Sequence, residues 1–586
     1  MTSKRYHSPR VTKARPGRGS EQTAMHNDER ANTHQPGSVP AEFLAALRDD
    51  LANRRIASGL ARLADHKDLV VTCRPGERHA AALLGYLAQW IDIGYPDAVL
   101  REVLPRFRQA QRDQFTLLEY VHVKMAEGLA AMREESYERA IKHFETVLAL
   151  QDEIHDKQVV AIAHYWLGRC LRRNARYADA LGFVAKGREI ALALKHPKMA
   201  AVMQVLEAWI AFQDGKPDDA ARILREAGDT LSDTDDHITL GNIASAYGRI
   251  ARRQGNHDLA LSKFETAIRE YEKRDPYNRN LARSFVNIAF VKRLLALQWR
   301  NRIDSAAARE RRKRSKRSMS ASSSTRAQSG SQDRERLLRL RAESFEHLKK
   351  ARAIYDRYDD HRGNGNVFIT LAYLHLDSGE LDLAATMGRT AYQLGDEKKD
   401  SLLKGRARML QSAIEFAKFE EQIEEQIAEG SGGVPSSELA CEFAREALEC
   451  AKRTQNRRLT AKAYITLGLA LTLDASDDLE AARECAKEAA ILLKQANHDY
   501  VWRELQELNR RLRGAGNVNA ALRDWSRGII GTKTFQEVSE DFASIVIPKV
   551  WRREGCKVAR VAARLSISPK KVRRILRAQG LLTEGE

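Results

Sequence analysis

Cysteine, proline and aromatic residues are all scarce in this 586-residue chain, and each scarcity excludes a class of protein. The six cysteines are scattered and form no Cys-x-x-Cys pair, which argues against a disulfide framework and a zinc finger. With 13 prolines and an aromatic content of 7%, an all-β sandwich is not expected. We interpret the cysteines as small core or surface residues of a protein in a reducing compartment.

Long apolar runs are also missing. No uninterrupted apolar stretch reaches about 18 residues, so no membrane span is expected. The first 20 residues are polar and basic and contain no apolar segment typical of a secretory signal. We therefore expect a cytoplasmic protein without membrane partners. At 586 residues the chain is too long for one compact core, which predicts several domains or a repeat array.

Motifs of catalysis are absent from the sequence. It contains no Gly-rich phosphate loop of the Walker kind, no Gly-x-Ser-x-Gly and no His-Glu-x-x-His. The 16 histidines show no metal-ligand spacing. We therefore expect no enzyme, no catalytic residues, no cofactor and no metal site.

Positive charge is in excess and is concentrated near the end of the chain. The formal net charge is +19, which favours a polyanionic partner. Residues 549–577 hold eleven Lys and Arg against the single acid Glu554, a local net charge of +10. About half of the excess therefore falls within the last tenth of the chain.

Small residues recur at a spacing of 40 residues in the middle of the chain. One row contains Gly128, Gly168, Ala208 and Gly248, a second contains Ala140, Ala180, Ala220 and Ala260, and the positions between them are Glu135, Ala175, Gly215 and Gly255. Two amphipathic helices joined by a tight turn approach closely only where small side chains meet. Because one hairpin cannot bury its apolar face alone, the spacing predicts hairpins stacked into a superhelix.

This order of small residues, turn and apolar residues resembles the tetratricopeptide repeat. The family's period is about 34 residues, so the longer period here suggests longer helices or linkers in each unit. The pattern returns at 371–391 and 464–489, and the resemblance covers about residues 45–510. It implies an all-α fold, a tetratricopeptide-like α-solenoid of helical hairpins, with repeats at 41–303 and 337–512.

Three segments lie outside the repeat pattern. Residues 1–40 form a basic tail without apolar periodicity and are expected to be disordered. Residues 304–336 form a basic, Ser-rich insertion that is also expected to be disordered. This insertion is a flexible solvated loop, an arm that contacts nucleic acid, or a phosphorylation target. The segment 430–437 is interpreted as a linker between two helices.

Residues 513–586 end in a pattern typical of two short helices. Apolar residues from Val558 to Leu565 have helical spacing, and Ser568 is a good N-cap. Pro569 fits the first helical position, so a second helix is predicted over Pro569–Ala578. Pro548 is expected to kink or break the preceding helix.

The run Val561-Ala562…Leu565-Ser566-Ile567-Ser568, which ends at Gly580-Leu581, resembles the Fis-type helix-turn-helix DNA-binding domain. Ser566 stands where that family usually has glycine in the turn. The resemblance covers about the last fifty residues and implies that Pro569–Ala578 enters the major groove of double-stranded DNA. The implied DNA contacts are Ser568 at the cap, Lys570, Lys571 and Arg574 at base edges, and Arg560, Arg564, Arg573 and Arg577 at phosphates. The alternative is a solvated basic helix pair packed on the repeats.

The tetratricopeptide resemblance also implies a concave groove that binds a protein or peptide partner. The 40-residue spacing places Tyr165, Arg169, Arg172, Trp209, Arg249 and Arg252 on its inner row. Arginines on either side of an apolar unit suggest a groove for an acidic peptide with an apolar anchor. The alternative is that these arginines are ordinary solvated or inter-repeat residues.

Two hypotheses follow from the sequence. The first is a DNA-binding transcriptional regulator whose repeats bind a protein partner and which forms a homodimer through its C-terminal domain. The second is a protein-interaction scaffold whose basic tail docks on acidic partners or RNA.

Overall fold

A computed structural model describes residues 38–314, 324–429, 437–454, 456–473, 479–493, 500–516, 533–579 and 581–582. All regular secondary structure in these residues is helical, which confirms the expected all-α class. Within the described residues, none of the helices has the length and apolar character that crossing a bilayer requires.

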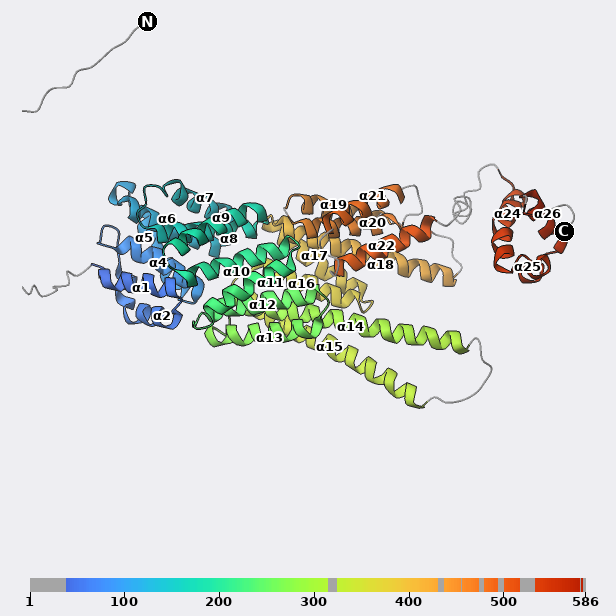
Figure 1. Ribbon diagram of the computed structural model, residues 1–586, viewed down its shortest axis with the longest axis horizontal. Helices are drawn as coiled ribbons and strands as arrows, with labels where there is room; N and C mark the ends of the chain where they lie inside the picture. The colour runs from blue at the N-terminus through green and yellow to red at the C-terminus, as the bar shows by residue number, and fades with distance from the viewer. Residues whose placement is uncertain are drawn as a thin grey trace, which may run out of the picture.

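The chain begins with three helices and continues as paired helical hairpins (Figure 1). The first three helices are α1 (Ala41–Asn53), α2 (Ile56–Asp65) and α3 (Lys67–Thr72). The next hairpins are α4 (Ala80–Ile93) with α5 (Asp97–Gln109), α6 (Leu117–Arg133) with α7 (Tyr137–Ala149), α8 (Lys157–Arg173) with α9 (Tyr177–Ala193), α10 (Pro197–Gln213) with α11 (Pro217–Leu231), and α12 (His237–Arg253) with α13 (His257–Arg274). The later ones are α14 (Arg279–Arg314) with α15 (Ser324–Arg357), α16 (His361–Leu376) with α17 (Leu381–Glu397), α18 (Ser401–Glu429) with α19 (Glu438–Lys452), and α20 (Arg457–Leu471) with α21 (Leu479–Leu493), followed by α22 (Tyr500–Gly516).

The small residues of the 40-residue spacing lie where the two helices of a hairpin cross. A Cβ on Gly128 of α6 would stand 2.7 Å from the Phe144 ring of α7, and a Cβ on Gly248 of α12 would stand 2.7 Å from the Phe264 ring of α13. The alanines of the second row, at 140, 180, 220 and 260, are all fully buried. The helices therefore pack as the spacing predicts, and the large rings fill the room that glycine leaves.

The turns within these hairpins share a left-handed backbone conformation. Glu135, Ala175, Gly215 and Gly255 have φ angles of 57°, 60°, 88° and 80°. Such a residue ends one helix and reverses the chain within a few positions, at a steric cost for any residue but glycine. The common turn is the reason why successive hairpins repeat the same geometry.

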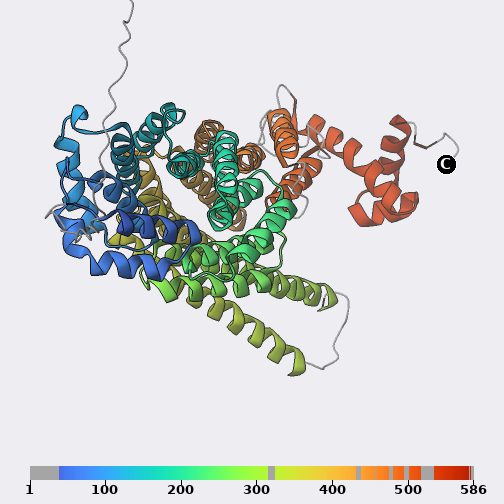
Figure 2. The same ribbon diagram turned by 60° about the vertical axis from the view of Figure 1, so that its left-hand side comes forward.

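Hydrogen bonds between distant hairpins close the superhelix on itself. Arg54 donates to Asp236 at 2.7 Å, Asn456 donates to the Tyr177 hydroxyl at 3.3 Å, and the Arg362 side chain donates to the Arg173 carbonyl at 2.9 Å. These partners are 182, 279 and 189 positions apart in the chain. Figure 2 shows the result, with the blue N-terminal helices beside the green helices of the middle hairpins. The inner surface of the superhelix is therefore enclosed by its own helices.

The expectation of a disordered insertion over 304–336 is wrong at both of its described ends. Helix α14 continues to Arg314 and α15 begins at Ser324, so this hairpin projects beyond its neighbours (Figure 1). Arg302 and Arg336 lie over the Trp299 ring, 4.8 and 4.7 Å from its centroid, and the Arg336 contact joins α15 to α14. Alanine and arginine are good helix formers, so low hydrophobicity alone does not prevent a paired helix here.

Most residues of the other segments that were expected to lack structure are not among the residues that the structure describes. Residues 1–37, 315–323 and 430–436 are not among the described residues. Within the expected N-terminal tail, Val39 is buried and its N–H donates to the Arg78 carbonyl at 3.2 Å.

The C-terminal unit consists of α24 (Phe535–Arg553), α25 (Val558–Leu565) and α26 (Pro569–Ala578) around a small apolar core. Pro548 is expected to kink or break the first helix, and the break does not occur, because α24 runs through it. A proline cannot donate to the carbonyl four residues earlier, which is that of Ser544. The side-chain amide of Gln579 donates to this carbonyl at 2.8 Å instead. The proline is thereby tolerated.

Candidate functional site

Two adjoining cavities lie along the inner wall of the superhelix, with volumes of about 440 and 360 Å³. Both are lined by Arg172 and Arg173 of α8, Trp209 of α10, Arg249 of α12 and Arg283 of α14. We call these five residues the shared wall. They all come from the first helices of successive hairpins, so these helices form the inside of the superhelix.

The six residues predicted for the groove lie on this inner surface. Tyr165 and Arg169 line the first cavity, and Arg252 lines the second. The remaining three, Arg172, Trp209 and Arg249, belong to the shared wall. The structure thus brings all six together, while their role in binding stays a prediction.

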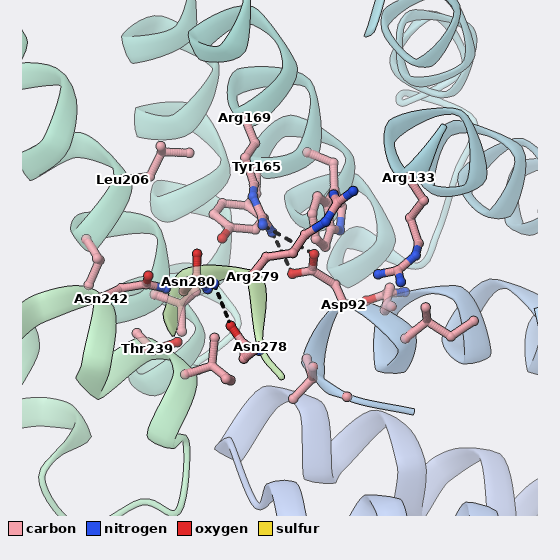
Figure 3. Close-up of a pocket in the computed structure, with 18 of the residues that line it drawn as sticks. Asp92, Arg133, Tyr165, Arg169, Leu206, Thr239, Asn242, Asn278, Arg279 and Asn280 are labelled. Carbon is pink, nitrogen blue, oxygen red and sulfur yellow. Dashed lines mark hydrogen bonds and ion pairs between the residues drawn. The ribbon is translucent and has the colours of Figure 1, made fainter. Parts of the chain in front are cut away.

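In the first cavity, arginines are neutralised by carboxylates of the chain (Figure 3). Arg169 makes two hydrogen bonds to Asp92, at 2.7 and 3.2 Å, and Arg133 pairs with Asp97 at 2.9 Å. Burial raises the pKa of Asp92, but Arg169, Arg133 and Arg54 outweigh it and hold this pKa below its ordinary value. This end of the groove is therefore internally charge-balanced.

The shared wall is different, because three of its arginines have no carboxylate partner among the described residues. The Arg172 guanidinium lies over the Trp209 ring, 4.6 Å from its centroid, and its buried Nε has no hydrogen-bond partner. Arg249 Nε donates to the Ser245 carbonyl at 3.2 Å. For Arg283, no hydrogen bond to another described residue is seen. None of these three guanidinium groups forms an ion pair with a carboxylate among the described residues, and Asp360 only partly offsets the charge of Arg283.

Burial and mutual repulsion lower the pKa of these three groups. Burial, with Arg173 and Arg283 nearby, brings the pKa of Arg172 well below its ordinary value. Burial and Arg283 lower the pKa of Arg249 to about 9, and burial and Arg173 lower that of Arg283. Because a guanidinium stays protonated in a protein, this shift reflects the cost of holding the charges together. An anion at the shared wall would relieve that cost.

The second cavity is strongly cationic and rich in aromatic rings. Its lining includes ten Lys and Arg side chains and one carboxylate, that of Asp360. Arg406 of α18 is one of them, and burial lowers its pKa. Sequence reasoning missed Arg283 and Arg406. Arg283 follows Arg249 by 34 positions. The groove residues were predicted with a spacing of 40, which does not reach Arg283.

In the C-terminal unit, the helix predicted over Pro569–Ala578 is present with those bounds. The Ser568 hydroxyl accepts a hydrogen bond from the Lys571 backbone N–H at 3.2 Å, as an N-cap does. Ser566, in the turn between α25 and α26, has a φ of 50°, the left-handed conformation that favours glycine. The turn thus has the backbone that the family's glycine would supply.

The basic residues predicted to contact DNA line the outside of this unit. Those that are exposed are Arg560, Arg564, Lys570, Arg573, Arg574 and Arg577, with the capping Ser568, while Lys571 is half-buried. Arg574 forms an ion pair with Glu540 of α24, and Arg564 forms one with Glu554. Arg574 and Arg564 are therefore engaged in ion pairs within the unit.

Comparisons with known proteins return only solved structures. No family model matches the sequence, and a search of curated proteins finds no match. A Rap protein complexed with Competence and Sporulation Factor matches at 12% identity and a TM-score of 0.47, over 71% of this chain and 99% of that one. A human IFIT1 dimer with PPP-AAAA matches at 14% identity and a TM-score of 0.40, over 82% and 96%.

A third match is a signal transduction ATPase with a tetratricopeptide repeat sensor from Pyrococcus horikoshii. It has 13% identity and a TM-score of 0.35, over 84% of this chain and 75% of that one. The assignment of the fold rests on the chain's own helices. They form an α-solenoid of stacked hairpins, and a separate three-helix unit follows it in the sequence.

Proposed function

We propose that this protein is a DNA-binding transcriptional regulator whose C-terminal unit is a helix-turn-helix. The observation that supports this best is the pair α25 and α26, joined by a left-handed turn at Ser566, with α26 capped by Ser568. In DNA-binding units of this arrangement, the second helix lies in the major groove. The basic outer side of α26 suits that position.

The basic residues of the unit divide into two groups by their position. Lys570, Lys571 and Arg574, near the start of α26, are assigned to base edges, where Arg and Lys donate to guanine O6 and N7. The arginines at 560, 564, 573 and 577 are assigned to phosphates. In the free protein the Glu540 carboxylate is paired with the Arg574 guanidinium. DNA binding would therefore replace this ion pair by a contact between Arg574 and a base.

An apolar face of α24 that is largely exposed among the described residues supports a homodimer. Phe535 is 86% exposed and Phe542 is 51% exposed. Val538 and Ile545 are half-buried and share that face at helical spacing. We assign a second copy of the chain to this face, because a two-fold dimer presents two α26 helices to successive major grooves.

The solenoid is assigned a protein or peptide partner in its inner groove. The cavities combine cationic side chains with aromatic rings such as Trp209, which suits an acidic segment with an apolar anchor. Partner binding on the repeats and DNA binding on the C-terminal unit would then be separate functions of one chain.

The test uses the full chain and duplexes selected from a random DNA pool, in gel shifts at rising salt. We expect a preferred sequence, and a loss of at least about 10-fold in affinity for the Lys571→Ala and Arg574→Ala variants. Glu540→Gln should bind more tightly, because it releases Arg574. The matched control is Arg222→Ala, at an exposed arginine of α11, which should bind like the parent.

Equal affinity for every duplex, for RNA and for other polyanions would contradict the proposal. That result would favour the scaffold hypothesis, in which the basic tail docks on acidic partners or RNA. Phe542→Glu tests the dimer. In the gel shift a monomer should bind a two-fold site more weakly, and in analytical ultracentrifugation it should sediment with half the parent's mass.

A further inference from the structure

The inner arginines of the solenoid fall into two sets. One set is neutralised by carboxylates that the fold places beside them, as Asp92 is beside Arg169 and Asp400 is beside Arg362. The three at the shared wall, Arg172, Arg249 and Arg283, have no such partner among the described residues. These three lie close enough to repel one another, so positive charge without an ion-pair partner accumulates at the shared wall.

We propose that Arg172, Arg249 and Arg283 bind a doubly charged tetrahedral oxyanion, a phosphoryl group carried by the ligand of the groove. This inference rests on the proposed role of the groove as a ligand site and is independent of DNA binding. It names the chemical group that the ligand places at the shared wall.

Unused hydrogen-bond donors support the proposal. Arg172 has a buried Nε without a partner, and its stacking on Trp209 holds the guanidinium plane in one orientation. Arg249 uses its Nε on the Ser245 carbonyl, and its terminal nitrogens make no hydrogen bond to the described residues. The site therefore has donors that are already positioned and not yet satisfied.

The charge balance favours a dianion over a single carboxylate. Arg172, Arg249 and Arg283 carry three charges without an ion-pair partner among the described residues, and one carboxylate would leave two of these charges unpaired. A phosphoryl dianion brings two charges and three acceptor oxygens, one for each arginine. Asp360, the one carboxylate that lines the second cavity, accepts from the Gly363 N–H at 2.7 Å and lies 3.9 Å from Arg279. It also interacts with Arg173 and Arg283, so its single charge is shared among several arginines.

Aromatic rings beside the shared wall suit the rest of the ligand. Trp209 lies in both cavities, and Phe212, Phe290 and Tyr373 line the second one. A phosphoryl group at the arginines would place the body of its carrier against these rings. The carrier is either a small phosphate ester or a phosphorylated peptide, and the experiment distinguishes the two.

Thermal unfolding of the full chain measures binding, because a ligand of the native state raises Tm. We expect inorganic phosphate at millimolar concentration to raise Tm in a saturable way, and acetate at equal ionic strength to leave it unchanged. In Arg249→Gln and Arg283→Gln the phosphate affinity should fall at least tenfold. The control Arg222→Gln, on the exposed face of α11, should respond to phosphate as the parent does.

The variants also show whether these arginines are merely structural. Removing a charge that has no partner relieves repulsion, so without phosphate both variants should unfold at or above the parent's Tm. A large fall in Tm in the absence of phosphate would overturn the proposal. Equal responses to phosphate and acetate, or a phosphate response kept in both variants, would also overturn it.

Competition separates this inference from the proposed function of the groove. An acidic peptide that binds the parent but is not displaced by phosphate would leave the groove as a partner site and overturn the phosphoryl site. A phosphorylated peptide that binds tighter than free phosphate, with loss in Arg249→Gln, identifies a peptide as the carrier. A small phosphate ester that does so identifies a small molecule.

Discussion

At the residue scale, single side chains complete backbone geometry that would otherwise be unfavourable. Ser566 holds the left-handed turn between α25 and α26, although an L-residue pays a steric cost there. Gln579 donates to the carbonyl that Pro548 leaves without its helical partner. Both side chains are exposed, so these two residues act through the backbone geometry that they support and not through packing in the core.

Replacing Ser566 with glycine should stabilise the C-terminal unit by roughly 0.5–1 kcal/mol, because glycine adopts the positive φ without strain. Native-state hydrogen exchange of the α26 amides measures this effect, and exchange should slow. The control Ala563→Gly, at an exposed position inside α25, should speed exchange, since glycine destabilises a helix interior by about 1 kcal/mol. Faster exchange in Ser566→Gly would contradict the prediction.

At the element scale, the close approach of two helices depends on which residue lies at their crossing. Gly248 of α12 faces the Phe264 ring of α13, and Gly168 of α8 faces the Val184 side chain of α9. A side chain at such a glycine would have to displace a buried neighbour, and a packed interior gives way only at a cost.

Gly248→Ala should lower the stability of the solenoid by about 1–3 kcal/mol, because the new Cβ would stand 2.7 Å from the Phe264 ring. Denaturant unfolding measures the loss. Gly182→Ala is the matched control, since Gly182 is an exposed position of α9 with no atom within 4 Å of the added Cβ. It should be neutral or stabilising by up to about 1 kcal/mol. Equal losses in the two variants would contradict the argument.

At the scale of the whole molecule, ion pairs between distant hairpins hold the superhelix closed. His361, at the start of α16, contacts Glu135 in the α6–α7 turn and Asp400 before α18. Burial lowers the pKa of His361, but hydrogen bonds to Asp400 and Glu135 outweigh it and raise the pKa to about 9. The protonated imidazole thus bridges two carboxylates.

Because this pKa is raised above its unfolded value of about 6.5, the contribution of His361 to stability is fully present below that pH. It is lost as the pH rises through about 9, and its size is on the order of 3 kcal/mol. The Tm difference between the parent and His361→Gln should therefore shrink from pH 6.5 to pH 9. His155→Gln, at an exposed turn, is the control. A difference that is constant or grows with pH would contradict the prediction.

The local features of the fold could be read from the sequence. Helix caps, apolar spacing and turn residues act over a few positions. The hairpins that follow the 40-residue spacing and the bounds of α26 were therefore predictable. The same local reasoning failed at Pro548. There the compensating donor, Gln579, comes from the far end of α26.

The sequence by itself determined that the chain forms stacked hairpins, and it made the arginines of the first helices candidates for their inner face. Only the tertiary structure decided which of these arginines are neutralised. Arg169 meets Asp92 from 77 positions away, while Arg172, three residues on, meets none among the described residues. Ion pairing depends on distance in space, and the closing of the superhelix sets that distance. This distance cannot be read from the spacing of residues along the chain.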